Sequence, residues 1–329
     1  MAKNRTILVT GSSGFVGYHL VNRLLTKGIS VIGVDNNNDY YDPKLKQERL
    51  KVLEKNKNFK FIKLNLQNKD LIKKLSKYNF TEIIHLGGQA GVRYSMENPF
   101  SYAYSNFVGS MNIFELAKVK KIKKVLYASS SSVYGLSKPP FSETSSIIDI
   151  PISVYAATKR SVEILAHTYF HLYGITMVGL RFFTVYGSYY RPDMAIFKFA
   201  KNILLGKEVT LYDSGKPKRG YTHVDDVVDG IIEALKIKPG NYYINLGGAE
   251  QISAKQLVIF LEKYLNKKAI IKNVPMQPGD VFETRSDQKV AQKLLKFKPK
   301  VKFEEGIKDF CDWFLQNQKW LLKLKPGKQ

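Results

Sequence analysis

A tyrosine and a lysine four residues apart, Tyr155 and Lys159, carry the clearest chemistry in this chain. Residues at this spacing lie on one face of a helix, one turn apart. A phenol ionises near pH 10, and a nearby ammonium group lowers that pKa by favouring the phenolate. We therefore expect Tyr155 to take a proton from a sugar hydroxyl while a nicotinamide ring takes the hydride. An ordinary surface helix shows the same pattern, so this interpretation needs a nucleotide site beside it.

A glycine-rich turn upstream predicts that nucleotide site. Gly11, Gly14 and Gly17 follow an apolar strand candidate, Thr6–Thr10, and precede a helical stretch. Glycines let the backbone approach a pyrophosphate, and the helix N-terminus offers free amides. Asp35 ends the second strand candidate, at the spacing of an acid that binds the adenosine ribose hydroxyls. Its carboxylate would repel a 2′-phosphate, which favours NAD over NADP. The alternative is a turn with an unrelated capping aspartate.

The first half of the chain alternates short apolar strands with helical stretches, which is typical of a parallel sheet covered by helices. The strands are predicted at 6–10, 30–34, 59–64, 82–86, 124–128 and 176–181, and the helices at 14–27, 69–77, 102–118 and 154–173. After Phe183, loops rich in Tyr, Arg, Gly and Pro interrupt this rhythm.

The fold class predicted from this pattern is α/β, with a Rossmann-type doubly wound parallel sheet and a smaller C-terminal substrate-binding lobe. We place the NAD-binding domain at 1–183 and the mainly substrate-binding, loop-built lobe at 184–329. A segment near 220–246 is expected to return to the sheet through a strand at 242–245.

The composition excludes several classes of protein. The chain has 329 residues, 44% hydrophobic and 24% charged, as in an ordinary globular protein. No apolar run approaches the ~20 residues that span a bilayer, and the N-terminus lacks a signal-peptide pattern. Cys311 is the only cysteine, and no Cys/His cluster has the spacing of a zinc site. We therefore expect no metal, no membrane partner and a cytoplasmic location.

The net charge of +24 has two interpretations. A basic surface neutralises phosphates, so one interpretation is nucleic-acid binding. The lysines, however, are spread along the chain, as at 118–124 and 296–300, and no RNA-binding, zinc-finger or helix-turn-helix pattern stands out. We therefore expect solvated basic faces without a nucleic-acid partner, which attract anionic small molecules such as nucleotide sugars.

Six segments carry a wider resemblance: 35–42 (DNNNDYYD), 85–95 (HLGGQAGVRYS), 127–135 (YASSSSVYG), 180–187 (LRFFTVYG), 191–195 (RPDMA) and 276–281 (MQPGDV). On these segments the chain resembles the extended short-chain dehydrogenase/reductase family. Within that family it resembles the nucleotide-sugar 4-epimerases, and most of all the UDP-glucuronate 4-epimerases. The likeness runs nearly end to end. The motifs are specific for the fold and for nucleotide sugars, and less so for one sugar.

The resemblance implies a role for each matched residue. Tyr155 would be the catalytic base, Lys159 would hold the cofactor ribose and lower the tyrosine pKa, and Ser130 would hydrogen-bond the reacting sugar hydroxyl. The implied cofactor-binding residues are Gly11, Gly14, Phe15, Val16, Gly17, Asp35, Asn36, Asn65, Leu66, Leu86, Gly87, Gly88, Gln89, Asn106, Tyr155, Lys159 and Phe182. The implied substrate-binding residues are Arg93, Ser131, Ser132, Thr184, Arg191, Arg219 and Asp280.

Two positions depart from the family pattern. Asn65 stands where an aspartate usually faces the adenine; its amide oxygen can still accept from the adenine amino group, but we expect weaker recognition. Gly87 and Gly88 replace a pair of alanines, which leaves more room beside the cofactor.

The residue before Val-Tyr-Gly indicates the reaction. Relatives that dehydrate or decarboxylate nucleotide sugars usually carry an acid there, because elimination needs general acid-base help. This chain has Ser132, flanked by serines, which favours redox-neutral 4-epimerisation through a transient 4-keto sugar. The serine run also suits the capping of a strand end.

Glucuronate adds a chemical constraint, because oxidation at C4 makes a β-keto acid that loses carbon dioxide when its carboxylate aligns with the carbonyl. A bidentate arginine is the natural clamp. Arg191 is the first candidate, Thr184 a hydrogen-bond donor and Arg93 the reserve. The alternative is that Arg191 pairs with Asp193 or binds the diphosphate.

Other functions remain open at this point. They are 4-epimerisation of UDP-N-acetylglucosamine or its uronate, a nucleotide-sugar reductase or dehydratase, and a non-catalytic NAD-sensing module. Tyr155 and Lys159 argue against the sensor. In the resembled family the stretches 102–118 and 154–173 pack against their copies, so we expect a homodimer. Polysaccharide biosynthesis is the expected pathway.

Overall fold

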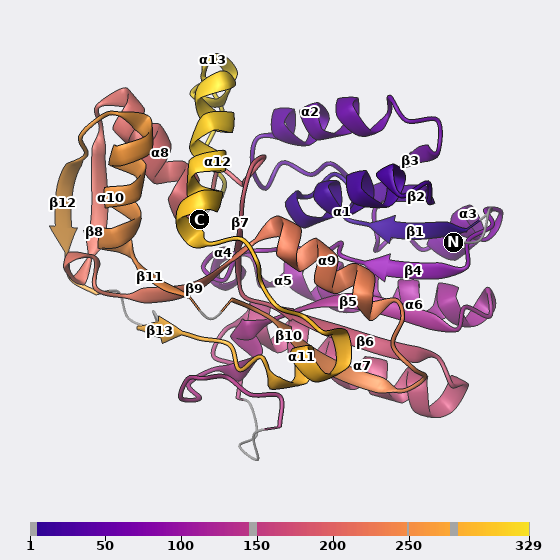
Figure 1. Ribbon diagram of the computed structural model, residues 1–329. Coiled ribbons are helices and arrows are strands. Elements are labelled where there is room, and N and C mark those ends of the chain that lie inside the picture. Colours follow the sequence, from indigo (N-terminus) through magenta and orange to yellow (C-terminus); the bar gives the residue numbers. More distant parts are fainter. Residues whose placement is uncertain (1–4, 145–149, 249, 277–281, 329) are drawn as a thin grey trace.

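A parallel sheet forms the centre of the protein. The computed structural model describes residues 5–144, 150–248, 250–276 and 282–328. The sheet has seven strands in the spatial order β10-β6-β5-β4-β1-β2-β3, and adjacent strands run parallel (Figure 1). These strands are β1 (Thr6–Thr10), β2 (Ser30–Asp35), β3 (Phe59–Lys63), β4 (Glu82–His85), β5 (Lys124–Ser130), β6 (Thr176–Phe182) and β10 (Asn241–Leu246). The predicted α/β fold class is confirmed.

Helices cover both faces of this sheet, so its strands are apolar on both sides. In β1, Ile7 and Val9 face one core and Leu8 faces the other, and all three are fully buried. The first core is covered by α1 (Phe15–Thr26), α2 (Pro43–Leu53), α9 (Val224–Ala234) and α11 (Lys289–Leu295). The second is covered by α3 (Leu71–Ser76), α6 (Gly109–Val119) and α7 (Val154–Tyr173).

Two helical regions differ from the sequence-based expectation. The helix predicted at 102–118 consists of α5 (Pro99–Tyr102), a π-helical turn η1 (Ala103–Val108) and α6. Helix α2 was not predicted, because its buried face combines leucines with Lys46 and Arg49 and so lacks a clean apolar stripe. The Asp42 carboxylate caps α2 by accepting from the Lys44 amide at 3.0 Å.

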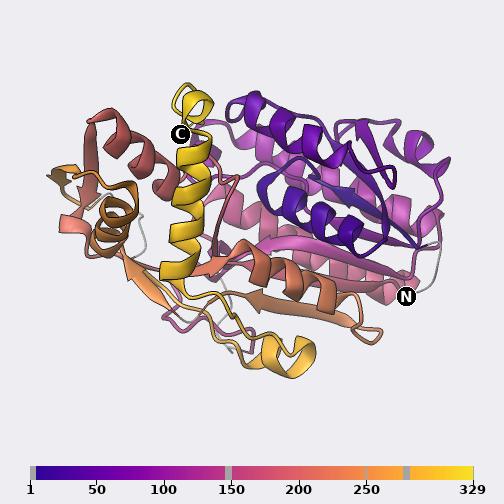
Figure 2. The ribbon, with the colours of Figure 1, turned by 45° about the horizontal axis from the view of Figure 1, so that its top comes forward.

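The lobe after residue 183 is built from helices and strands rather than mainly from the expected loops. Strands β8 (Glu208–Tyr212) and β12 (Ile270–Val274) pair in parallel beside α8 (Ala195–Leu205) and α10 (Ala254–Leu265). Strand β9 (Lys218–His223) pairs with β7 (Thr184–Tyr186), β11 (Gln251–Ser253) and β13 (Glu283–Thr284). Helix α12 (Phe303–Gln316) stands between this lobe and the central sheet (Figure 2). The remaining elements are α4 (Tyr94–Glu97), η2 (Ser131–Tyr134), η3 (Asp213–Gly215) and α13 (Gln318–Leu321).

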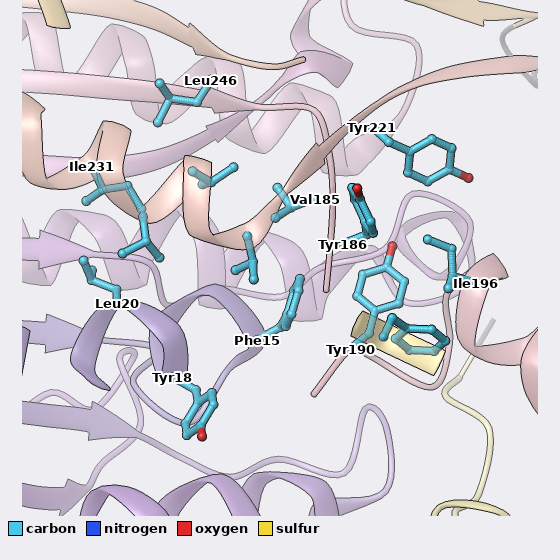
Figure 3. Packing of buried hydrophobic residues seen from close by; sticks show 14 of the residues in the cluster. Phe15, Tyr18, Leu20, Val185, Tyr186, Tyr190, Ile196, Tyr221, Ile231 and Leu246 are labelled. Atoms are coloured by element: carbon cyan, nitrogen blue, oxygen red, sulfur yellow. The ribbon is translucent and has the colours of Figure 1, made fainter. Parts of the chain in front are cut away.

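One hydrophobic core joins the lobe to the sheet (Figure 3). Phe15 of α1 packs edge-on against Tyr190, with ring centroids 5.1 Å apart, and Tyr190 packs against Phe310 of α12. Tyr186 of β7 packs against Tyr221 of β9 at 5.8 Å. The glycine turn before α1 is therefore held in one packed unit with the segment 186–195, which follows β7.

Candidate active site

The predicted site residues gather at the carboxyl edge of the sheet, where ligands bind in doubly wound folds. The turn after β1 holds Gly11 to Gly17, the end of β2 holds Asp35 and Asn36, and Asn65 and Leu66 follow β3. Leu86 to Gln89 follow β4, Ser130 to Ser132 end β5 and form η2, and Phe182 and Thr184 lie at the end of β6 and the start of β7. Strand order reverses at β1, between β2 and β4.

The turn after β1 leaves no room for side chains at two of its glycines. Gly11 has φ +70°, and a Cβ there would lie 2.7 Å from the Gly87 amide nitrogen. A Cβ on Gly17 would collide with the Gly11 carbonyl oxygen. Helix α1 begins at Phe15 with Gly14 as its cap, no capping side chain and no acid in its first turn. Its first-turn amides are therefore a ready site for an anion.

Short polar side chains hold the loop after β2. The Asn37 amide donates to Asp35 Oδ1 at 2.9 Å, and Ser13 Oγ donates to Asn37 Oδ1 at 2.6 Å. These bonds tie the predicted ribose-binding carboxylate to the glycine turn. Asn36 Nδ2 approaches Asn65 Oδ1 at 3.5 Å, so the two predicted adenine-side residues are neighbours. Leu66 is buried, and its carbonyl accepts from Asn112 Nδ2 at 2.8 Å.

Asn106 connects the loop after β4 to helix α7. Its Oδ1 accepts from the Gln89 amide at 2.7 Å, and its Nδ2 donates to the Gln89 carbonyl at 3.2 Å and to Thr158 Oγ1 at 3.0 Å. Thr158 immediately precedes Lys159 on α7. Asn106 is buried in the π-helical turn η1, a deviation from α-helix that is frequent at functional sites.

Helix α7 presents the tyrosine-lysine pair at its start. Ser153 Oγ caps the helix by accepting from the Ala156 amide at 3.1 Å, which fixes Tyr155 in the first turn. Lys159 Nζ donates to the Ala128 carbonyl at 2.9 Å and lies 6.0 Å from the Tyr155 ring centroid. Burial lowers the pKa of Lys159 to about 8, which is opposed by the charge of Glu163. Lys159 thus still carries a positive charge at neutral pH.

The pKa of Tyr155 differs from the expectation. Burial raises it above its ordinary value, and the Ser130 hydrogen bond and the charge of Arg191 lower it. The sequence pattern predicted that Lys159 would lower this pKa. The structure instead assigns that effect to Ser130 and Arg191, because the Lys159 ammonium is directed to the Ala128 carbonyl.

Arg191 lies near Tyr155 and is paired with Asp193. Its Nε donates to Asp193 Oδ1 at 3.0 Å and its Nη2 to Asp193 Oδ2 at 2.5 Å. The guanidinium also lies over the Tyr40 ring, 5.7 Å from its centroid, and the Tyr40 hydroxyl donates to Asp193 Oδ2 at 3.3 Å. Burial lowers the pKa of Arg191, but the charge and hydrogen bond of Asp193, together with Tyr40 and Tyr41, raise it, and the net shift is upward.

The remaining predicted substrate residues occupy several elements. Arg93 precedes α4 and lies over the Tyr212 ring at 5.6 Å. Arg219 of β9 donates to the Lys218 and Phe282 carbonyls at 2.9 and 3.3 Å. Ser131 and Ser132 are half-buried in η2, where the Ser132 amide donates to Ser130 Oγ at 3.1 Å. Thr184 is half-buried in β7. Asp280 lies outside the described residues.

Sequence reasoning gave no role to Tyr40 or Tyr102, and it named Asp193 only as an alternative partner of Arg191, a pairing that the structure confirms. Tyr102 packs edge-on against Tyr155 at 6.1 Å and donates to the Ala90 and Gly91 carbonyls. Tyr40 and Asp193 surround the guanidinium of Arg191. Tyr40 and Asp193 stand inside the motifs on which the resemblance rests, so the sequence contained a signal for them. Tyr102 lies outside those motifs.

His85, the last residue of β4, makes side-chain hydrogen bonds to β1 and α6 just before the loop that follows β4. Its Nδ1 lies 2.6 Å from Thr10 Oγ1 and its Nε2 lies 2.9 Å from Ser110 Oγ. Burial and the charge of Lys159 lower the pKa of His85 to about 3, so the ring is neutral at physiological pH.

The arrangement fits NAD. The uncapped first turn of α1 suits a pyrophosphate, the fixed Asp35 suits ribose hydroxyls, and Lys159 with Tyr155 lies where sheet strands β5 and β6 end. An acid at the end of β2 favours NAD over a 2′-phosphorylated cofactor, because its carboxylate would repel the phosphate.

Comparison with known proteins places the chain in a family. The model of the NAD dependent epimerase/dehydratase family matches residues 7–247. The chain belongs to this family. It is 54% identical over 327 residues to an uncharacterised protein of Methanocaldococcus jannaschii, covering 98% of this chain and all of the relative. It is 42% identical to a UDP-glucuronate 4-epimerase of Thermodesulfobacterium geofontis, covering 97% of this chain and 98% of the relative.

A solved structure of a UDP-glucuronic acid 4-epimerase is also similar to this chain. The UDP-glucuronic acid 4-epimerase of Bacillus cereus, in complex with UDP-glucuronic acid and NAD, matches with a TM-score of 0.88. The match has 35% identity and covers 95% of this chain and 99% of that one. The predicted resemblance to UDP-glucuronate 4-epimerases and the predicted cofactor NAD are confirmed.

The described parts of the chain hold no membrane-spanning helix and no metal-binding cluster. No helix there is long and apolar enough to cross a membrane. No group of three or more His, Cys, Asp or Glu residues there is arranged to hold a metal ion.

Proposed function

We propose that this protein is a UDP-glucuronate 4-epimerase that interconverts UDP-glucuronate and UDP-galacturonate with tightly bound NAD. The observation that carries the choice of sugar is the position of Arg191, whose charge acts on Tyr155 within the same site. The family assignment and the relatives named as UDP-glucuronate 4-epimerases support the reaction. A cation beside the catalytic base suits a sugar with a carboxylate at C6.

The residues of this chain divide the proton chemistry between them. Tyr155 takes the proton from the C4 hydroxyl and returns it after the sugar has turned over. Ser130 hydrogen-bonds the same oxygen, Ser130 and Arg191 favour the phenolate state of Tyr155, and Lys159 binds the cofactor ribose. Bound NAD supplies the acceptor and donor of the C4 hydride. Because the same hydride returns to C4, no net oxidation occurs.

Arg191 can hold the substrate carboxylate while it remains paired with Asp193. Asp193 occupies the side of the guanidinium formed by Nε and Nη2. A guanidinium carries five N–H groups, so Nη1 and Nη2 keep N–H groups that Asp193 does not use, in the geometry that binds a second carboxylate. A carboxylate held there cannot rotate freely into alignment with a C4 carbonyl, which protects the 4-keto sugar from decarboxylation.

The test is product analysis without added cofactor. Purified protein incubated with UDP-glucuronate should form UDP-galacturonate, and absorbance at 340 nm should stay flat. UDP-glucose and UDP-N-acetylglucosamine are run in parallel. Accumulation of NADH would indicate a dehydrogenase, and preference for UDP-N-acetylglucosamine would replace the proposed sugar.

We further propose a homodimer formed by α6, α7 and the segment before them. Large apolar side chains are exposed there: Phe100, Tyr104, Val119, Ile164, Leu172 and Tyr173. An exposed apolar patch on helices of a globular protein marks an interface. We also propose a cytoplasmic location and a role in polysaccharide biosynthesis, where a UDP-uronate epimerase would supply acidic sugars.

A further inference from the structure

The segment Leu324–Lys328, here called the strap, joins helix α8 to the loop after β2, which are far apart in sequence. On one side the Lys201 ammonium of α8 donates to the Leu324 carbonyl. On the other side the strap reaches the loop after β2: the Lys325 amide donates to Asp42 Oδ2 at 3.0 Å, and the Lys328 amide donates to the Tyr40 carbonyl at 2.9 Å.

Between these hydrogen bonds, the strap packs directly against Asp193. Gly327 is buried, and a Cβ there would lie 2.6 Å from Asp193 Cβ and 3.2 Å from the Tyr40 carbonyl oxygen. Such a distance is shorter than real Cβ contacts allow, so the backbone of Gly327 packs against the side chain that holds Arg191. A side chain at this position would have to displace Asp193, the strap, or both.

The ion pair at the end of the strap contributes little by comparison. Lys328 Nζ donates to both carboxylate oxygens of Asp39 at 3.0 Å, but the two side chains are 45% and 76% exposed. Solvent and salt screen such a pair, and its net value is small. The main-chain hydrogen bonds and the Gly327 contact therefore fix the strap, and the Lys328 side chain does not.

A shift of the Asp193 side chain would also shift Arg191, because hydrogen bonds couple the two. Its two oxygens accept from Nε and Nη2 of Arg191, and one of them also accepts from the Tyr40 hydroxyl. Asp193 is almost fully buried and Arg191 largely so. A displacement of the carboxylate at Gly327 is therefore transmitted to the guanidinium, and from there to the charge that lowers the pKa of Tyr155.

We propose that the strap is a positioning element of the active site, in which Gly327 holds Asp193 and thereby sets the place of the Arg191 guanidinium. The inference rests on the proposed function for its effect on the sugar carboxylate. Its effect on Tyr155 is independent of which sugar is bound. The strap touches neither the sugar nor the cofactor in this account.

The experiment uses two opposite lesions in the full-length enzyme. Gly327→Ala introduces a clash with Asp193, and deletion of residues 327–329 removes the contact while leaving the bonds of Leu324 and Lys325. The matched control is Lys325→Ala, which alters an exposed side chain of the same strap whose amide alone makes the contact with Asp42. Unfolding temperatures of all variants are measured first, so that only folded enzymes are compared.

Both lesions should raise KM for UDP-glucuronate about three- to tenfold with a smaller change in kcat, and should leave KM for UDP-glucose within twofold, as expected for one weakened hydrogen-bonding group. They should also move the acidic limb of the kcat–pH profile upward, because Tyr155 loses part of the charge that lowers its pKa. Lys325→Ala should match wild type in both measurements.

Folded lesion variants with wild-type KM and pH profile would overturn the proposal, as would an equal effect of Lys325→Ala. Failure of the proposed function is distinguishable: wild type itself would then not turn over UDP-glucuronate. If wild type turns over a different UDP-sugar, the shift of the acidic limb of its kcat–pH profile, measured with that sugar, still tests the role of the strap.

Discussion

Replacement of Arg191 by alanine should separate acidic from neutral sugars. The guanidinium would make charge-assisted hydrogen bonds to the C6 carboxylate, and a hydrogen bond to a charged group is worth about 1.5–3 kcal/mol. At about 1.4 kcal/mol per factor of ten, kcat/KM for UDP-glucuronate should fall roughly 10- to 150-fold. UDP-glucose lacks the carboxylate, so it should lose only the smaller effect that Arg191 has on the pKa of Tyr155.

The same substitution leaves Asp193 as a buried carboxylate without its cation, and breaking a buried pair costs about 3–5 kcal/mol of stability. The assay therefore includes the double variant Arg191→Met/Asp193→Asn, which removes both charges, and the remote control Arg23→Ala. Arg23 pairs with Asp225 and Asp229 across α1 and α9. Products are separated by chromatography, with epimer and UDP-pentose followed independently.

Arg191→Ala should also release some UDP-pentose, because a freed carboxylate can align with the C4 carbonyl and leave as carbon dioxide. The clamp would be refuted if the folded single and double variants lost the same factor with UDP-glucuronate and UDP-glucose. An epimerase without a carboxylate clamp would then remain, and the choice of sugar would need another explanation.

Three further predictions test other parts of the account. Tyr155→Phe should lower kcat about 10²- to 10⁴-fold while NAD still co-purifies; near-normal turnover would contradict its role as the base. The stability of the protein should fall as pH drops from 6.5 toward 3, because the unfolded chain protonates His85 and the folded one, with its pKa near 3, does not. A His85→Gln variant should show a shallower loss between pH 7.5 and 5 in chemical denaturation, and an unchanged slope would exclude this histidine. Ile164→Glu on the exposed face of α7 should give a monomer by light scattering, and a monomeric wild type would argue against the dimer.

The central sheet could be predicted from sequence because most of its strands are buried on both faces and read as short, nearly continuous apolar runs between turn residues. The edge strand β3 instead mixes apolar residues with lysines, and Lys60 and Lys63 are exposed. The predicted strand ends differ from the structure by at most two residues. Helix α2 escaped prediction for the opposite reason. Its buried positions include Lys46, bonded to Asn38, and Arg49, bonded to the Ser13 and Tyr189 carbonyls, so tertiary contacts rather than periodicity make it a helix.

The residues of the site could be predicted from the sequence, but most of their hydrogen-bond partners and their pKa shifts could not. Tyr155, Lys159 and Ser130 come together as their motifs indicated, but spacing along a helix could not show where the Lys159 ammonium points. The alternative that Arg191 pairs with Asp193 is confirmed, but the sequence could not show which side of the guanidinium Asp193 occupies. The strap contact at Gly327 joins residues 134 positions apart, 193 and 327, and leaves no local signal.

The most direct test of the central claim follows the C4 hydrogen itself. UDP-glucuronate carrying deuterium at C4 is incubated with the purified protein in ordinary water without added NAD. The account predicts UDP-galacturonate that retains deuterium at C4, because the hydride leaves and returns within one active site. Loss of the label to solvent or to free NADH, or absence of the C4 epimer, would contradict it.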